Sequence, residues 1–218
     1  MRVAALSLLL LSLAACGGGG EPDGPRGLLD GIPQEGVILG DPDAPVTLVE
    51  FADLQCPYCA RFTHTAFPAI VEEYVRTGEV RLVFRGVAFL GPDSEEALRA
   101  VLAAGQQGKL WQLVELLYAH QGPENSGWVT DELVRELGQG VEGLDVERMM
   151  AERTSEAVEV ELALAAQAAE RARVDGTPIF WAGPTDEPLR LLAKGAAEAA
   201  AFRSALDGLL GETAREAA

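Results

Sequence analysis

The most constraining feature of this sequence is a C-x-x-C pair, Cys56 and Cys59, placed where a strand-like apolar run meets a helix-like segment. The chain has 3 cysteines, and the third, Cys16, lies in an apolar N-terminal segment. A framework of structural disulfides or a four-cysteine zinc site therefore cannot be built from the remaining pair. The sequence predicts that the two sulfurs carry redox chemistry.

The N-terminus predicts export. Residues 3–15 form an apolar run preceded by Arg2, and this run is too short to span a bilayer comfortably. We therefore interpret residues 1–15 as a secretory signal peptide. Leu13-Ala14-Ala15-Cys16 resembles the bacterial lipobox, which implies that Cys16 is lipidated and becomes the first mature residue. The alternative is an ordinary signal peptide with an incidental Cys16. In both cases we expect an extracytoplasmic protein, in a periplasm or at the outer face of the cell membrane.

Composition narrows the partners that such a protein could bind. Residues 16–36 are rich in glycine and proline, which is typical of a flexible linker, and we interpret them as a membrane tether. The net charge of −17 argues against nucleic acid and against anionic lipid bound through basic patches. The remaining length suits one domain with a sizeable insertion.

Beyond the tether, strand-like and helix-like segments alternate, which predicts an α/β fold. Strands are expected at residues 37–39, 46–51, 80–89, 179–182 and 189–193. Helices are expected at residues 59–76, with a kink where Pro68 interrupts the pattern, through most of residues 93–173, and at residues 196–210. Within the long helical stretch, apolar side chains recur at helix spacing, namely Leu110, Leu113, Val114, Leu117 and Tyr118.

Four stretches together resemble the DsbA-like branch of the thioredoxin superfamily: residues 39–45, 49–59, 105–111 and 174–178. The resemblance extends over nearly all of residues 37–210. It implies a thioredoxin fold, a central mixed β-sheet flanked by helices, over residues 37–212, with an inserted helical domain at about residues 93–173. It also implies a thiol–disulfide oxidoreductase that needs no cofactor.

The two cysteines are expected to have different roles. Cys56 should lie at or just before the first turn of a helix, where unpaired N–H groups and the helix dipole favour a thiolate. Cys59, one turn further on, is suited to resolving a mixed disulfide. Pro57 fits the first helical turn, and Tyr58 could either contact substrate or pack internally. The same Cys-Pro-Tyr-Cys motif occurs in glutaredoxins, so the motif does not choose between oxidant and reductant.

Glu50, Thr177 and Pro178 complete the candidate site. Glu50 lies in a predicted strand, where burial of a carboxylate is costly unless it has a hydrogen-bond or charge partner or a functional role. Its position matches an acidic residue of DsbA-like proteins, which implies a proton acceptor for Cys59; the alternative is a strand-end residue with its carboxylate in water. The resemblance implies that the Thr177–Pro178 bond is cis and faces the sulfurs, so that the backbone of Thr177 could pair with an extended substrate.

Three functions are compatible with these residues. The first is an exported, monomeric disulfide donor to reduced or unfolded proteins, reoxidised by a quinone-linked membrane thiol oxidase of the DsbB or vitamin K epoxide reductase type. The second is an exported reductase, for example in cytochrome assembly. The third is a Cu(I) metallochaperone that uses Cys56 and Cys59. We expect no metal at the site, because His64 with two thiolates would supply only three ligands.

Overall fold

The computed structural model describes residues 27–216. The predicted signal peptide, the lipobox with Cys16 and the first part of the predicted tether lie outside the described residues. No helix within residues 27–216 is both long enough and apolar enough to cross a membrane.

The centre of the molecule is a mixed six-stranded sheet with the order β1-β2-β4-β3-β5-β6. The middle strand, β3, pairs in parallel with β4 and antiparallel with β5. All seven of its residues are buried, as its continuous apolar sequence predicts for a strand covered on both faces. The strands are β1 (Gln34–Glu35), β2 (Ile38–Leu39), β3 (Val46–Ala52), β4 (Val80–Gly86), β5 (Ile179–Pro184) and β6 (Arg190–Lys194).

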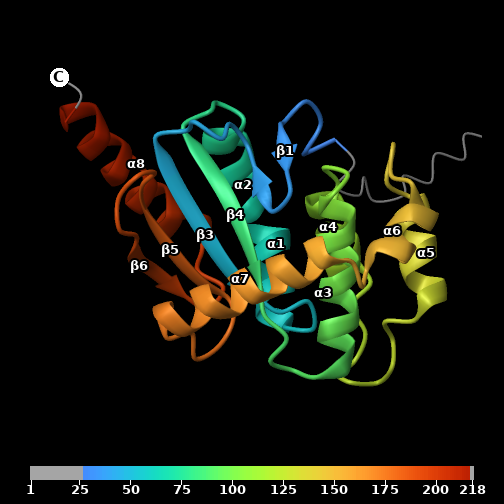
Figure 1. The fold of residues 1–218 in the computed structure, drawn as a ribbon. Coiled ribbons are helices and arrows are strands. Elements are labelled where there is room, and N and C mark those ends of the chain that lie inside the picture. The colour runs from blue at the N-terminus through green and yellow to red at the C-terminus, as the bar shows by residue number, and fades with distance from the viewer. Residues whose placement is uncertain (1–26, 217–218) are drawn as a thin grey trace, which may run out of the picture.

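Helices cover both faces of this sheet (Figure 1), which confirms the predicted α/β fold. On one face, an aromatic cluster joins α1, β5 and α8, with the ring centroid of Phe62 4.5 Å from that of Phe180 and 5.3 Å from that of Phe202. Helix α7 crosses the opposite face. The helices are α1 (Pro57–Thr65), α2 (Phe67–Ile70), the single π-turn η1 (Val71–Val75), α3 (Pro92–Gly105), α4 (Leu110–Ala119), α5 (Asp131–Gln139), α6 (Val146–Glu152), α7 (Glu156–Ala172) and α8 (Ala199–Glu216).

The helix that follows the cysteine pair is broken near Phe67, as the sequence predicts. Helix α1 ends at Thr65, and α2 begins at Phe67 with Pro68 in its first turn. Proline has no N–H to donate to the preceding turn, so the chain restarts as a new helix there. Helices α3 to α7 lie between β4 and β5 in sequence; α3 to α6 lie to one side of the sheet, and α7 crosses its face (Figure 1).

Two predicted boundaries need correction. The predicted tether extended to residue 36, but Leu29 and Ile32 are buried in the core and β1 pairs with β2, so residues 27–36 belong to the folded domain. The third predicted strand extended to residue 89, whereas β4 ends at Gly86. The backbone amide of Phe89 instead donates a hydrogen bond to the side chain of Asp53. It therefore pairs with a side chain and not with a neighbouring strand.

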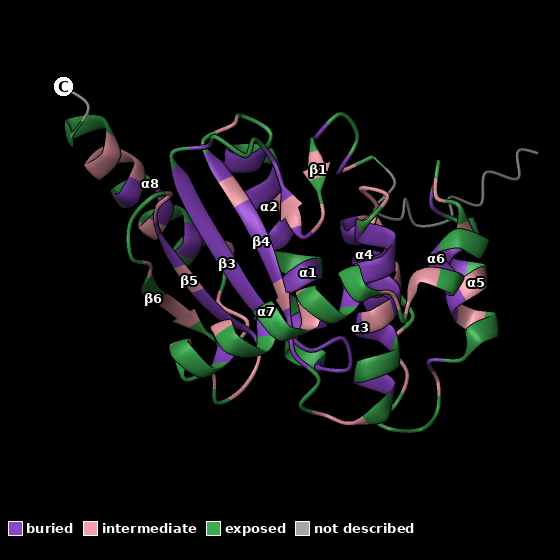
Figure 2. Cartoon of the chain, viewed as in Figure 1, coloured by how far each residue is buried: buried purple, intermediate pink, exposed green. Residues whose placement is uncertain are grey.

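Burial follows this architecture. The sheet interior and the inner faces of α1, α3 and α4 are buried, whereas α7 and α8 expose much of their surface (Figure 2). The largest fully buried side chain is that of Trp111, whose ring stacks on Phe67 at 5.6 Å and meets Phe84 edge-on at 5.8 Å. Because Trp111 lies on α4 and Phe84 on β4, one core is shared by the sheet and the inserted helices.

Candidate active site

Cys56 and Cys59 lie at the start of α1, and both are free thiols. Cys56 is the N-cap residue with extended backbone angles, and its carbonyl accepts the amides of Cys59 and Ala60, each at 3.1 Å. Pro57 occupies the first helical position, where a missing N–H is tolerated. Cys56 is 5% exposed and Cys59 is fully buried. Cys56 is therefore slightly more accessible than Cys59.

The surroundings of Cys56 stabilise its thiolate. A hydrogen bond from Cys59 is the largest contribution, and further hydrogen bonds from the Thr177 side chain and from the amides of Cys59 and Tyr58 act in the same direction. Burial opposes them, and together they lower the pKa of Cys56 to about 6. At pH 7 the thiolate is therefore the main form of Cys56. This stabilises the reduced protein by about 1.4 kcal/mol, or about 30 mV toward a more oxidising couple.

The loop before β5 brings Thr177 and Pro178 to the same sulfur. The Thr177–Pro178 peptide bond is cis, as the resemblance implies. The Sγ atom of Cys56 lies 3.3 Å from the carbonyl oxygen of Thr177, to which it donates a hydrogen bond when it is protonated. Residues 121 positions apart in the sequence thus meet at one reacting atom.

Glu50 is buried in the middle of β3, so the alternative of a carboxylate in water is wrong. The residue is 2% exposed, and its Oε1 atom has no hydrogen-bond partner among the described residues. Burial raises the pKa of Glu50 to about 8, with a further contribution from the negative charge of Cys56. The charge of Glu50 in turn contributes to raising the pKa of Cys59. The charges of Glu50 and the cysteine pair therefore affect one another's pKa values.

Cys59 is held as a neutral thiol. Burial is the largest cause that raises its pKa well above the usual range, followed by the hydrogen bond to Cys56 and by the charges of Glu50 and Cys56. A proton acceptor is therefore needed before Cys59 can attack a disulfide. Glu50 is a buried acidic group whose charge contributes to the raised pKa of Cys59.

Tyr118 is a site residue that sequence reasoning missed. Its side chain is 3% exposed, and its hydroxyl donates to the carbonyl oxygen of Asp53 at 3.2 Å. Burial raises the pKa of Tyr118 well above its usual range, with further contributions from the charges of Cys59, Glu50 and Cys56. In the sequence, Tyr118 is one member of an apolar helical stripe. That pattern predicts its burial but not its approach to the sulfurs.

Asp53 is the second missed residue, and it organises the loop that precedes Cys56. Its Oδ1 accepts hydrogen bonds from the backbone amide of Gln55 at 2.8 Å and from the Ser94 hydroxyl at 2.6 Å. Its Oδ2 accepts from the amides of Phe89 and Leu90 at 2.8 and 3.0 Å. One fully buried carboxylate thus joins the active-site loop to the end of the β4 segment and to α3.

Gln55 extends this network into the helical insertion. Its Nε2 donates to Ser94 Oγ at 2.9 Å and to Asn125 Oδ1 at 3.1 Å, and its Oε1 accepts the amide of Asn125 at 2.6 Å. Gly91 lies against the same asparagine with a φ of 122°, and a Cβ atom there would come within 2.5 Å of Asn125 Oδ1. The insertion therefore supports the loop that carries Cys56.

The remaining candidates lie on the surface. Tyr58 is 61% exposed, which is incompatible with the internal packing that the sequence left open, and Pro57 beside it is also exposed. Together they present a ring and a proline next to Cys56. His64 is exposed on α1. Within residues 27–216, no group of three or more His, Cys, Asp or Glu side chains could hold a metal ion.

Comparisons with known proteins agree with this geometry. The family model described as Thioredoxin matches residues 33–186. The chain is 31% identical over 146 residues to the probable disulfide bond formation protein D of Bacillus cereus, a match that covers 66% of this chain and 68% of that protein. It also resembles the crystal structure of alpha-DsbA1 from Wolbachia pipientis, with a TM-score of 0.72, 18% identity, and coverage of 84% of this chain and 94% of that one. Oxidised BdbD from Bacillus subtilis gives a TM-score of 0.70 at 23% identity, with coverage of 83% and 98%. These two structural matches concern the fold alone.

Proposed function

We propose that this chain, which belongs to the thioredoxin family as a DsbA-like thiol–disulfide oxidoreductase, works as a disulfide donor to reduced proteins outside the cytoplasm. The observation that supports transfer from the protein to its substrate is the stabilised thiolate of Cys56, whose pKa is lowered to about 6. A thiol with a low pKa is a good leaving group and stabilises the reduced form, so the protein readily transfers its disulfide to substrate thiols.

The proposed transfer has two steps. A substrate thiolate attacks Sγ of Cys56 in the Cys56–Cys59 disulfide, the bond between the cysteines breaks, and Cys59 leaves as a thiolate that takes up a proton. A second substrate thiolate then attacks the substrate sulfur of the mixed disulfide and releases Cys56 as a thiolate. The substrate dithiol loses two electrons, and the cysteine pair gains them. The exposed Tyr58 and Pro57 and the backbone of Thr177 lie where an extended substrate would bind.

The protein is tested as a donor by single-turnover transfer. The oxidised protein is mixed with an equal amount of reduced, unfolded ribonuclease A, and free thiols are trapped over time. We expect two substrate thiols to disappear for each Cys56–Cys59 pair that becomes reduced. If the reduced protein instead reduces disulfides in native insulin while its oxidised form leaves ribonuclease thiols unchanged, the reductase function replaces this proposal.

We infer that Glu50 exchanges a proton with Cys59 in this cycle. Once Cys56 is part of a mixed disulfide, its negative charge is gone, and one of the two causes that raise the pKa of Glu50 is removed. The carboxylate then becomes easier to form, and it can accept the proton when Cys59 attacks. In the opposite step, the protonated carboxyl can return that proton to the departing Cys59 thiolate.

Glu50→Gln is expected to slow resolution by Cys59 about a hundredfold, within the usual range for general acid–base catalysis. Attack by Cys56 on an external disulfide should change little. The measurement is stopped-flow reaction of the reduced protein with oxidised glutathione, with formation and decay of the mixed disulfide resolved. Glu136→Gln, on the exposed face of α5, is the control. Equal rates for both steps in Glu50→Gln and in the unaltered protein would contradict the role of Glu50.

The same variant should change the pH dependence of stability. The Glu50 carboxyl ionises at about 4.5 when unfolded but only at about 8 when folded, so the unfolded state releases its proton first. The free energy of unfolding therefore falls as pH rises between these two values, by an amount on the order of 5 kcal/mol. Urea denaturation of the reduced protein from pH 4 to pH 9 should show this slope. Glu50→Gln should make it shallower by the share of Glu50, while the share of Glu115, whose pKa is also raised to about 8, remains.

We further propose that Cys16 is acylated and anchors the mature chain to a membrane, with residues before the folded domain acting as the tether. The support is the lipobox-like sequence after a short apolar run. Two or more acyl chains would give stable anchoring. Metabolic labelling with an alkyne fatty acid should mark the unaltered protein in the membrane fraction, while Cys16→Ser should be unlabelled and released. Labelling that persists in Cys16→Ser would contradict acylation at Cys16.

An anchored donor needs a source of oxidising equivalents near the membrane. We propose that the monomeric protein is reoxidised by a quinone-linked membrane thiol oxidase of the DsbB or vitamin K epoxide reductase type. The support is chemical, because each substrate oxidation leaves two electrons on Cys56 and Cys59. A tether restricts the search for such a partner to the region beside the bilayer.

A further inference from the structure

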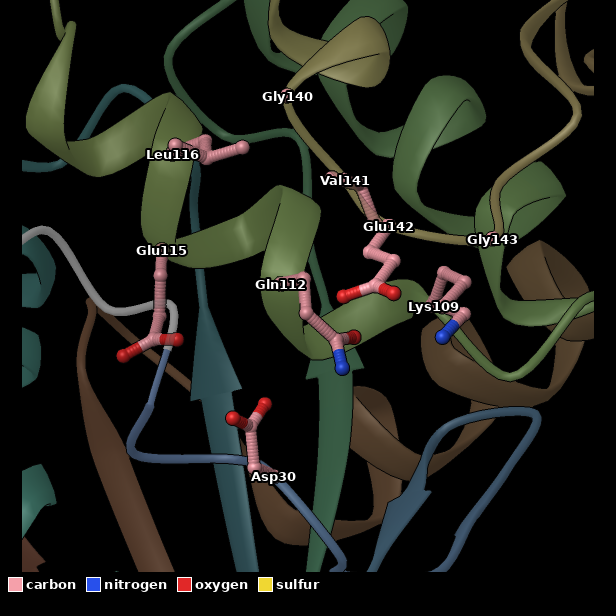
Figure 3. A pocket seen from close by; sticks show the side chains of 9 residues that line it. All are labelled: Asp30, Lys109, Gln112, Glu115, Leu116, Gly140, Val141, Glu142 and Gly143. Atoms are coloured by element: carbon pink, nitrogen blue, oxygen red, sulfur yellow. The ribbon is translucent and has the colours of Figure 1, made fainter.

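A cavity with both polar and apolar lining residues lies at the helical insertion, and none of the active-site residues line it. Its volume is about 370 Å³, within the range of small-ligand sites. It is enclosed by α4, by the segment that carries Asp30 and by the loop between α5 and α6 (Figure 3). Asp30, Lys109, Gln112, Glu115, Leu116 and residues 140–143 line it.

Glu115 is the least accessible polar group of this cavity. It is 4% exposed, and its Oε2 atom has no hydrogen-bond partner within residues 27–216. Burial raises the pKa of Glu115 to about 8. A buried acceptor without a donor is destabilising, so Glu115 is a group that a ligand could satisfy.

Gln112 adds a second acceptor one turn earlier on α4. Its buried Oε1 atom also lacks a partner among the described residues. Figure 3 shows the amide of Gln112 and the carboxyl groups of Glu115 and Asp30 around the space between α4 and the Asp30 segment. The cavity is therefore rich in hydrogen-bond acceptors.

The charges of the lining favour a cation. Asp30 and Glu142 are exposed acidic residues at the cavity, and Lys109 is the one basic residue among its lining side chains. When Glu115 is ionised, the lining has a net negative charge. Leu116 and Val141 contribute apolar surface, which suits methylene groups better than the hydration shell of an ion.

We propose that this cavity binds a small organic cation of the polyamine class, with an ammonium group between Glu115, Gln112 and Asp30. An ammonium supplies three N–H donors and no acceptor, which complements a lining of oxygen acceptors. A metal ion is a poorer match, because no group of three or more potential ligand side chains within residues 27–216 has a metal-binding arrangement. The neutral Glu115 carboxyl loses its proton to solvent when the cation binds, since a nearby positive charge favours the carboxylate.

Isothermal titration of the full chain in detergent with spermidine tests this proposal. At pH 7 and moderate salt, we expect saturable binding at one site. Repeating the titration in two buffers of different ionisation enthalpy should reveal release of up to one proton for each bound spermidine. Glu115→Gln should weaken binding about tenfold or more, because it removes a charge-assisted hydrogen bond, and should abolish the proton release.

Two further variants distinguish spermidine binding in the cavity from non-specific attraction of spermidine to a protein with a net charge of −17. Glu142→Gln, beside the cavity, should weaken binding less than Glu115→Gln. Glu136→Gln removes the same charge from an exposed position on α5 that does not line the cavity, and it should leave the affinity unchanged. Absence of saturable spermidine binding would overturn the proposal, as would equal losses in Glu136→Gln and Glu115→Gln. Saturable Ca²⁺ binding that depends on Glu115, with no spermidine binding, would also overturn the proposed ligand class.

Discussion

Cys56→Ala is expected to abolish disulfide transfer, with a loss of about three orders of magnitude or more, whereas Cys59→Ala should still react once. Cys56 is the sulfur with the stabilised thiolate, and Cys59 is a buried neutral thiol. Removing Cys56 leaves no reactive nucleophile at the start of α1. Removing Cys59 leaves the nucleophile but no resolving thiol, so a mixed disulfide should accumulate.

The two variants are compared with a labelled disulfide peptide and analysed by non-reducing electrophoresis and mass spectrometry. Both substitutions remove one sulfur from the same helix, so each controls for the other. We expect a stable adduct on Cys56 in Cys59→Ala and no adduct in Cys56→Ala. An adduct on Cys59 in Cys56→Ala, formed at a rate similar to that of the unaltered protein, would reverse the assigned roles.

Asp53→Ala is expected to lower the free energy of unfolding by about 3 to 4 kcal/mol, because it leaves three amides and one hydroxyl without their acceptor in a buried place. The same carboxylate joins the loop before Cys56 to α3. We therefore expect slower reaction of Cys56 as well, through a less ordered loop. Urea denaturation monitored by tryptophan fluorescence measures the first effect.

Asp43→Ala serves as the matched control for Asp53→Ala. Asp43 is exposed in the turn before β3, and its removal should change the free energy of unfolding by no more than about 0.5 kcal/mol. A loss below about 1 kcal/mol in Asp53→Ala would show that the network around Asp53 is not what holds the active-site loop.

Local sequence patterns predicted the parts of this site that lie within one or two elements. The apolar run that becomes β3 predicted a strand buried on both faces, and the break at Pro68 predicted the end of α1 near Phe67. The spacing of Cys56 and Cys59 predicted two sulfurs one turn apart. Each of these features depends on backbone preferences or periodicity over a few residues, which a single sequence contains.

Contacts over long sequence distances could not be predicted in the same way. Tyr118 has the spacing of an ordinary core residue on α4, and only the packing of that helix brings its hydroxyl to the loop of Asp53. Asp53 similarly gains distant partners from α3 and from the loop between β4 and α3. The short strand β1 was missed because two residues, Gln34–Glu35, carry too little periodicity to be recognised.

If the cysteine pair donates its disulfide, the equilibrium redox potential of Cys56 and Cys59 must lie well above that of a thiol reductant. The full chain is equilibrated with glutathione buffers at pH 7, and the fraction of reduced protein is determined by thiol trapping. Membership of the DsbA-like branch predicts a potential between about −120 and −180 mV, well above that of thioredoxin, and the Cys56 thiolate supplies about 30 mV of this difference. A value near about −270 mV would contradict it, because the reduced form would then be the working state and the protein would act as a reductant.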